Sequence, residues 1–136
     1  MKKLKKLKKP RKISIKGLKL KAWGAMSRYI RTRDKRCVTC GSGIAEHCGH
    51  YLRNGERNAQ LGGNALWFDE RNFGGQCAAC NLYRNGEPTK FAIFLEYKHR
   101  HGILQELSDL RNKPKKWTRE EIIEVEKKFN ERAHNV

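Results

Sequence analysis

Apolar residues recur at helical spacing near the N-terminus, where every fourth position is apolar: Leu18, Ala22, Met26 and Ile30. Residues four apart lie on one face of an α-helix, so the pattern predicts a helix from about Leu18 to Thr32. Trp23 and Tyr29 lie beside this stripe. Because aromatic side chains at such spacing are usually buried, we expect both to belong to the core.

Three further amphipathic stretches occupy the C-terminal part. The pattern predicts a helix from about Thr89 that stops near Gly102, and a short one over residues 103–110 that ends before Pro114. Thr118, with a glutamate three residues later, is typical of a capping box and predicts the start of a last helix. That helix would bury one apolar stripe: Ile122, Val125, Phe129 and Ala133.

The middle of the chain shows no helical periodicity. We expect short strands at residues 48–52 and 65–68, with a turn at Asn54-Gly55 between them. Cys77 and Cys80 then begin a helix, which turns both thiols to one face.

The cysteines add a metal site to this outline. Four of the five form two C-x-x-C pairs: Cys37, Cys40, Cys77 and Cys80. Four thiolates match the ligand number and softness that tetrahedral Zn²⁺ prefers, so the pairs predict one structural zinc. His47 or Cys48 remains an alternative ligand, although Cys48 fits better as a small buried residue. A thiol–disulfide oxidoreductase is disfavoured, because its βαβ pattern is missing.

Composition and charge indicate the partner. With 136 residues, 38% of them hydrophobic, the chain can bury one modest core that a metal would supplement. The net charge of +17 points to nucleic acid. Neither a signal peptide nor an apolar run for a membrane is evident, so we expect a cytoplasmic protein. The predicted DNA contacts are Lys5, Lys6, Lys8, Lys9, Arg11, Lys12, Arg28, Arg31, Arg53 and Arg84.

The predicted fold class is a small α+β domain with a zinc-stabilised core flanked by helices. Residues 1–21 contain eleven Lys or Arg and no acidic residue, which predicts a basic arm over residues 1–17 that follows phosphates. A solubilising tail or a nuclear-import signal would have the same composition. The domain over residues 18–136 divides into an N-terminal helix (18–36), the zinc core (37–86) and a helical C-terminal part (87–136).

The second cysteine pair belongs to a longer motif. The stretch Asn72-Phe-Gly-Gly-Gln-Cys77-Ala-Ala-Cys80-Asn81-Leu-Tyr-Arg84 fits N-[LF]-x-x-x-C-x-x-C-[HN]-x-x-[KR]. With Gly49-His50-Tyr51 upstream, it resembles the zinc-supported HNH, or ββα-metal, nuclease motif of treble-clef type. Together with Phe68-Asp-Glu-Arg-Asn72 and Lys116-Trp-Thr118, the chain from about Trp23 onward resembles the NinG/Rap family of phage recombination endonucleases.

That resemblance implies an enzyme that cuts branched DNA such as Holliday junctions. It implies that His50 is the general base, that Asn72 braces the loop after it, and that Asn81 coordinates a catalytic Mg²⁺ or Mn²⁺. A neutral imidazole suits proton abstraction near pH 7, and a divalent cation suits charge stabilisation at phosphorus. Symmetric cleavage of a four-way junction implies a homodimer. If the chain is phage-encoded, its compartment is the host bacterial cytoplasm.

One position departs from the motif. Many HNH enzymes carry a metal-binding aspartate immediately before the catalytic histidine, where this chain has Gly49. A neutral amide alone would hold Mg²⁺ weakly, so another oxygen ligand is expected. Glu70 is the preferred candidate, with Asp69 and Glu46 as alternatives.

Two other functions stay open. A non-catalytic zinc-binding module for nucleic acid explains the charge and the cysteines, but not His50, Asn72 and Asn81 at HNH spacing. A sequence-reading HNH nuclease acting on linear duplex would share every motif and differ only in substrate.

Overall fold

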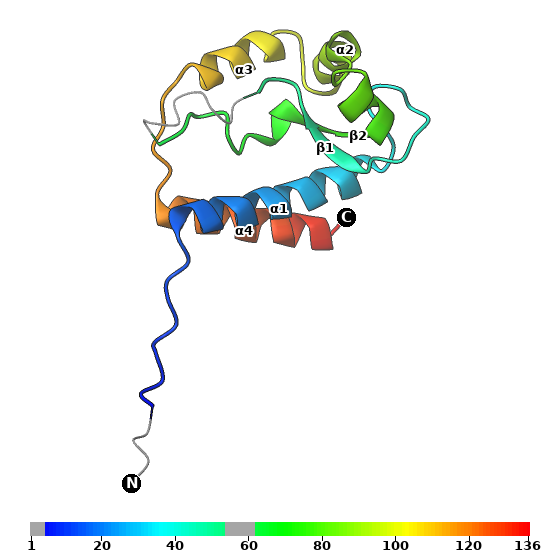
Figure 1. Ribbon diagram of the computed structural model, residues 1–136. Helices are drawn as coiled ribbons and strands as arrows, with labels where there is room; N and C mark the ends of the chain where they lie inside the picture. The colour runs from blue at the N-terminus through cyan, green and yellow to red at the C-terminus, as the bar shows by residue number, and fades with distance from the viewer. Residues whose placement is uncertain (1–4, 54–61) are drawn as a thin grey trace.

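The computed structural model describes residues 5–53 and 62–136, which form a small α+β fold with one two-stranded sheet (Figure 1). Residues 1–4 of the basic arm and the expected Asn54-Gly55 turn lie outside the described residues. The elements are α1 (Ile15–Asp34), β1 (His47–His50), the 3₁₀ turn η2 (Glu70–Asn72), β2 (Phe73–Gln76), the short π-helix η3 (Ala79–Tyr83), α2 (Pro88–Lys98), α3 (Ile103–Arg111) and α4 (Arg119–His134).

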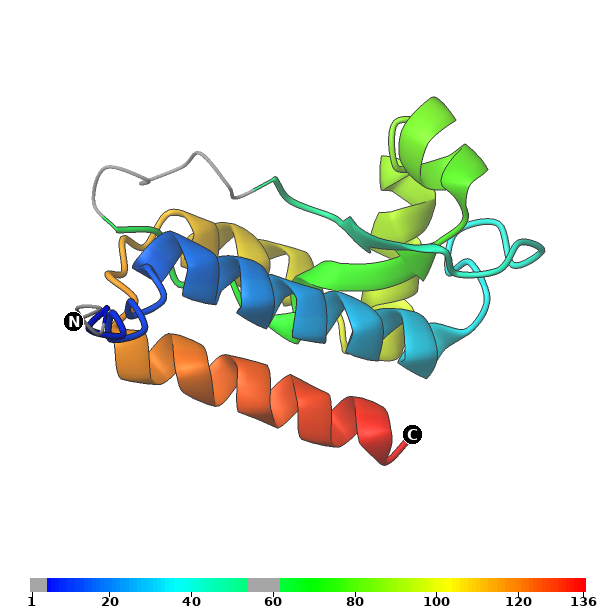
Figure 2. The ribbon, with the colours of Figure 1, turned by 60° about the horizontal axis from the view of Figure 1, so that its bottom comes forward.

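The β-hairpin lies between two helical layers (Figures 1 and 2). Helices α1 and α4 pack side by side on one face, where Met26, Phe73 and Phe129 are fully or almost fully buried. Helices α2 and α3 pack together on the other face, over a second cluster that includes Leu66 and Phe91. Among the described residues, the buried apolar side chains outside the cysteine cluster therefore divide between two small cores.

Helix α1 confirms the N-terminal periodicity. It begins at Ile15, earlier than expected, because the Ser14 hydroxyl accepts a hydrogen bond from the Gly17 amide at 3.1 Å and caps the first turn. Trp23 packs edge-on against Phe73, with 5.2 Å between ring centroids. Tyr29 packs in the same cluster, so both aromatic residues contribute to the core as predicted.

The C-terminal helices follow the amphipathic pattern, with one correction. The capping box of α4 is present: the Glu121 amide donates to the Thr118 hydroxyl at 3.2 Å, and the Thr118 amide donates to the Glu121 carboxylate at 3.0 Å. Gly102 does not end α2, which stops at Lys98. With a φ of +93°, in the left-handed region that favours glycine, Gly102 is instead the cap residue directly before α3.

The predicted strand over residues 65–68 is wrong, because these residues form turns. The Asn64 side chain accepts a hydrogen bond from the Leu66 amide at 2.9 Å, which closes a local turn. Leu66 enters the core beneath α2 and α3, whereas Phe68 enters the core beneath α1 and α4. The run is apolar because it supplies both cores, and not because it pairs with another strand.

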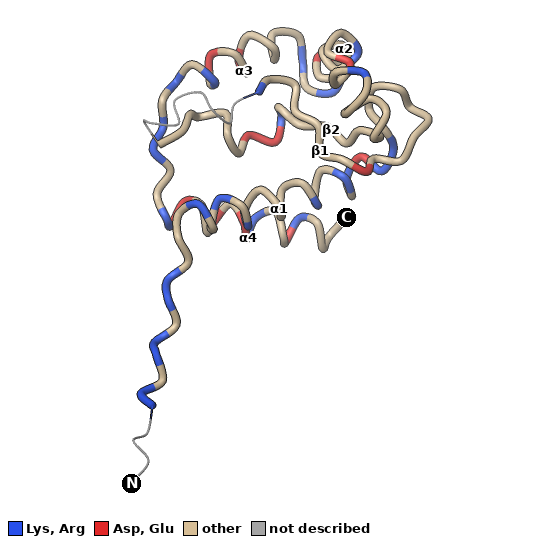
Figure 3. Tube along the Cα trace, viewed as in Figure 1, with Lys and Arg blue, Asp and Glu red and all other residues tan. Residues whose placement is uncertain are grey.

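The basic segment before α1 is extended and exposed. Its described residues before Ser14 form neither helix nor strand, and Lys and Arg residues recur along this part of the trace (Figure 3). Within residues 5–53 and 62–136, no helix has the length and apolarity needed to cross a bilayer.

Candidate functional site

The four predicted zinc cysteines meet at one place. Cys37 and Cys40 lie in the turn after α1, and Cys77 and Cys80 lie where β2 passes into η3. All four sulfur atoms are within 4.8 Å of one another, and the Cys40 and Cys77 sulfurs are 3.8 Å apart. A tetrahedron with Zn–S bonds of about 2.3 Å has edges of about 3.8 Å, so the cluster has the dimensions of a Zn–S₄ site.

Backbone contacts hold the first cysteine pair against the hairpin. The Cys37 amide donates to the Gly43 carbonyl at 2.8 Å, and the Val38 amide donates to the Gly75 carbonyl of β2 at 2.9 Å. Gly41 has a φ of +73°, so glycine suits the turn that returns the chain after Cys40. The two cysteine pairs are thus joined through β2 as well as through the sulfur cluster.

The thiols of the cluster have unequal acidity. Hydrogen bonds from the Ser42 hydroxyl and from the Ser42 and Gly43 amides lower the pKa of Cys40 to about 5. The Cys80 amide lowers the pKa of Cys77, but burial and the neighbouring thiols outweigh it and raise the value to about 11. Four thiolates this close repel one another, and a divalent cation among them offsets that repulsion. The donor set therefore fits structural zinc.

The alternative zinc ligands lie outside this cluster. Among the described residues, the group contains the four cysteines and neither His47 nor Cys48. Cys48 packs against the core beneath α1, and burial raises the pKa of its thiol to about 12. Cys48 is thus a half-buried residue packed against the core, and it is not a member of the sulfur cluster.

His50 is the last residue of β1, and Asn72 stands directly before β2. His50 pairs with Phe73 in the antiparallel register and is exposed, whereas Asn72 is fully buried. The Leu52 amide donates to the Asn72 side-chain oxygen at 2.9 Å, and the Asn72 amide group donates to the Leu52 carbonyl at 3.0 Å. Asn72 thus holds both polar backbone groups of Leu52, two residues beyond His50.

The surroundings of His50 favour its neutral form. Although the side chain keeps contact with solvent, partial burial of the ring lowers its pKa below the ordinary imidazole value, and the positive charge of Arg53 lowers it further. A neutral imidazole has a free nitrogen lone pair that can accept a proton, which is the property a general base needs.

Asn81 follows Cys80 on η3 and is half-buried. Its backbone amide donates to the Cys77 carbonyl at 3.0 Å, so its position depends on the cysteine cluster. Arg84 closes the same short helix, with its guanidinium 3.8 Å from the Cys80 sulfur.

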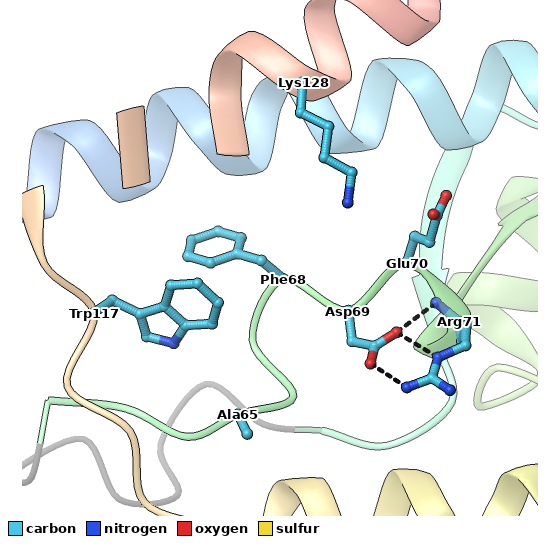
Figure 4. A pocket seen from close by; sticks show the side chains of 7 residues that line it. All are labelled: Ala65, Phe68, Asp69, Glu70, Arg71, Trp117 and Lys128. Atoms are coloured by element: carbon cyan, nitrogen blue, oxygen red, sulfur yellow. Dashed lines mark hydrogen bonds and ion pairs between the residues drawn. The ribbon is translucent and has the colours of Figure 1, made fainter. Parts of the chain in front are cut away.

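Glu70, the preferred second metal ligand, has another partner in the structure. It lines a cavity of about 290 Å³ between η2 and α4 (Figure 4), and its carboxylate accepts a hydrogen bond from Arg132 at 2.5 Å. The Asp69 carboxylate accepts hydrogen bonds from Nε and Nη2 of Arg71, at 2.9 and 2.7 Å. Glu46 is exposed ahead of β1. The role of Glu70 at a metal stays a prediction.

The predicted DNA contacts fall into separate groups. The six basic residues of the arm, Arg53 and Arg84 are exposed. Arg28 donates to the Asn130 side chain of α4 at 3.1 Å, and Arg31 donates to the Ser27 carbonyl at 3.3 Å. Arg28 therefore joins α1 to α4, whereas the Arg31 hydrogen bond lies within α1.

Comparison with known protein families shows to which family the chain belongs. All residues, 1–136, match the family described as Bacteriophage Lambda NinG protein. The chain belongs to the NinG family. Searches of curated proteins and of solved structures found no match. Membership is consistent with a role in phage recombination and agrees with the family that the motifs around His50 and Cys77 indicated.

Sequence reasoning missed one buried residue of this NinG-family site. Gln76 ends β2 directly before Cys77 and is fully buried. It occupies an unspecified position of the cysteine motif, so the motif itself does not single it out. The only sequence signal is the glycine at position 49, whose small size leaves space for a neighbouring side chain.

Replacing Asn72 with alanine tests the loop brace. Asn72→Ala removes two hydrogen bonds and leaves the Leu52 amide and carbonyl unpaired, so we expect a loss of about 2–3 kcal/mol in the free energy of unfolding. Urea denaturation measures the change. Asn130→Ala is the matched control: it removes one exposed hydrogen bond, from Arg28, and leaves no buried group unpaired, so stability should change by about 0.5 kcal/mol or less. Equal stability losses in the two variants would contradict the brace.

Proposed function

We propose that this NinG-family protein is a divalent-metal-dependent endonuclease that cuts branched DNA and that its core is an HNH, or ββα-metal, unit of treble-clef type. One arrangement carries the proposal. His50 ends the first strand of a hairpin, buried Asn72 braces the loop after it, and the second strand leads through Cys77 and Cys80 to Asn81.

The residues divide the chemistry between them. His50 accepts a proton from the water that attacks phosphorus, and its lowered pKa keeps it neutral at physiological pH. The zinc cysteines have a structural role, because they fix η3 and hence Asn81 relative to the hairpin. A bound Mg²⁺ or Mn²⁺ would stabilise charge at the phosphorus and the departing oxygen, with Asn81 as one of its ligands.

The charge distribution supports DNA as the substrate. The exposed basic segment before α1 can follow the phosphate backbone and add affinity through release of counterions. Such contacts do not distinguish branched from linear DNA, so the preference for junctions rests on the family relationship. A homodimer would place two copies of His50 on opposite strands of a four-way junction.

A cleavage assay tests the function. We expect purified protein with Mg²⁺ to nick a four-way junction near its branch point and to leave a linear duplex of the same arm sequences intact. The products should carry 5′-phosphate and 3′-hydroxyl ends. Binding of the junction without cleavage would favour a non-catalytic zinc-binding module. Cleavage of both substrates at one sequence would favour a sequence-reading nuclease.

A further inference from the structure

Gln76 and Gly49 face the same side of the hairpin. In the antiparallel register, Gly49 pairs with Gly74, and His47 pairs with Gln76. Alternate residues of a strand share a face, so the Gln76 side chain lies diagonally beside the position where a side chain of residue 49 would begin. Residue 49 directly precedes His50 on β1, so the Gln76 side chain lies beside the strand residue that comes immediately before the proposed general base.

The amide group of Gln76 is held in one orientation. Its nitrogen donates to the Gly86 carbonyl at 2.8 Å and to the Thr39 hydroxyl at 3.1 Å. A carbonyl can only accept a hydrogen bond, so the nitrogen must face Gly86 and the oxygen must face away from it. Within residues 5–53 and 62–136, that oxygen, Oε1, is buried and has no hydrogen-bond partner. A buried carbonyl oxygen without a partner costs stability, so its presence needs an explanation.

Oε1 of Gln76 occupies the space that a side chain on residue 49 would take. A Cβ atom added to Gly49 would lie 2.0 Å from Oε1 and 2.8 Å from Cδ of Gln76. Gly49 does not have a positive φ, so its backbone conformation does not require glycine. Glycine stands at this position because the Gln76 amide fills the space beside it.

We propose that Oε1 of Gln76 is an oxygen ligand of the catalytic divalent cation and replaces the carboxylate that many HNH enzymes carry before the histidine. This inference rests on the proposed nuclease function. An amide oxygen is a suitable ligand for a hard cation, and coordination would satisfy the one polar atom of Gln76 that lacks a partner. Gln76 and Asn81 would supply two neutral oxygens, so the charge that balances the cation comes mainly from DNA phosphates.

Paramagnetic broadening by Mn²⁺ tests this ligand without relying on activity. In the zinc-loaded, ¹⁵N-labelled protein, we expect low Mn²⁺ concentrations to broaden the side-chain amide signals of Gln76 and Asn81 first, together with the backbone signal of Gly49. In Gln76→Met, which keeps the volume but lacks the amide, broadening at Asn81 should require about tenfold more Mn²⁺ or greater. Zinc content and the dispersion of the spectrum show whether the variant is folded.

A second test does not depend on Gln76→Met: it moves the oxygen ligand from residue 76 on β2 to residue 49 on β1. Gly49→Asp alone should lose Mn²⁺ binding and melt at a lower temperature, because its side chain collides with Gln76. Gly49→Asp combined with Gln76→Ala places a carboxylate in the vacated space, so Mn²⁺ binding and cleavage should recover relative to Gln76→Ala. A double variant no better than Gln76→Ala would overturn the assignment.

The outcomes separate this inference from the proposed function. If the wild-type protein cuts junctions and Mn²⁺ broadens Asn81 but not Gln76, the nuclease function stands and the Gln76 assignment is wrong. If Mn²⁺ broadens no side chain selectively and no DNA is cut, the metal centre and the Gln76 assignment both fail. Selective broadening at Gln76, with recovery in the double variant, supports the assignment.

Discussion

Cys77→Ser is expected to lose its zinc and unfold the centre of the molecule. Structural zinc contributes about 10–16 kcal/mol of apparent binding free energy in zinc-finger peptides, as much as the whole stability of a typical small domain. Cys77 is central because it joins β2 to η3, and because the first cysteine turn packs directly against it: a Cβ atom on Gly43 would lie 2.6 Å from the Cys77 Cβ. Atomic absorption measures the zinc, and thermal melting measures the stability.

Cys48→Ala is the matched control for this variant. Cys48 is a half-buried thiol on β1 that lies outside the sulfur cluster. Its replacement should keep a full complement of zinc and lower the melting temperature only slightly. Full zinc retention and normal melting in Cys77→Ser would show that the cluster does not hold the metal.

His50→Ala is expected to abolish cleavage while junction binding and zinc content stay unchanged. Removing a general base typically lowers the rate by a factor of about 10² to 10⁴. His47→Ala is the matched control, because His47 lies on the same strand, is half-buried and takes no part in the sulfur cluster. Single-turnover cleavage, compared with binding measured without divalent cation, separates catalysis from affinity.

The pH dependence of cleavage provides an independent test of His50. A general base acts when it is deprotonated, so the rate should fall as acidification protonates the imidazole. Because burial and Arg53 lower the pKa of His50, the midpoint of this fall should lie below the ordinary histidine value of about 6.5. Cleavage by His50→Ala at nearly the wild-type rate, or with the same acidic limb, would assign the proton transfer to another group.

Local patterns in the sequence were sufficient for the helices and for the cysteine site. The stripe from Leu18 to Ile30 predicted α1, and the pairing of Thr118 with Glu121 predicted the start of α4. These signals are reliable because helical hydrogen bonds and caps join residues three or four apart. The spacing of the cysteines likewise identified the four thiols that the fold brings together.

Contacts between residues far apart in the sequence decided the features that local patterns did not predict. The apolar run at residues 65–68 became a turn, because its side chains supply two separate cores rather than one face of a sheet. Glu70 lies close in sequence to Asn72, but α4 brings Arg132 to its carboxylate. Neither the packing of residues 65–68 nor the contact between Glu70 and Arg132 can be found from spacing along the chain.

At the candidate active site, Gln76 and Gly49 likewise show what the local sequence reveals and what depends on tertiary contacts. The sequence by itself showed that the residue before His50 is a glycine and that an oxygen ligand was missing there. Only the register of β1 on β2 brings the Gln76 oxygen to that place, and only the contacts with Thr39 and Gly86 orient its amide. A motif records which residues are present, whereas the direction of a buried side chain depends on the groups that the fold packs around it.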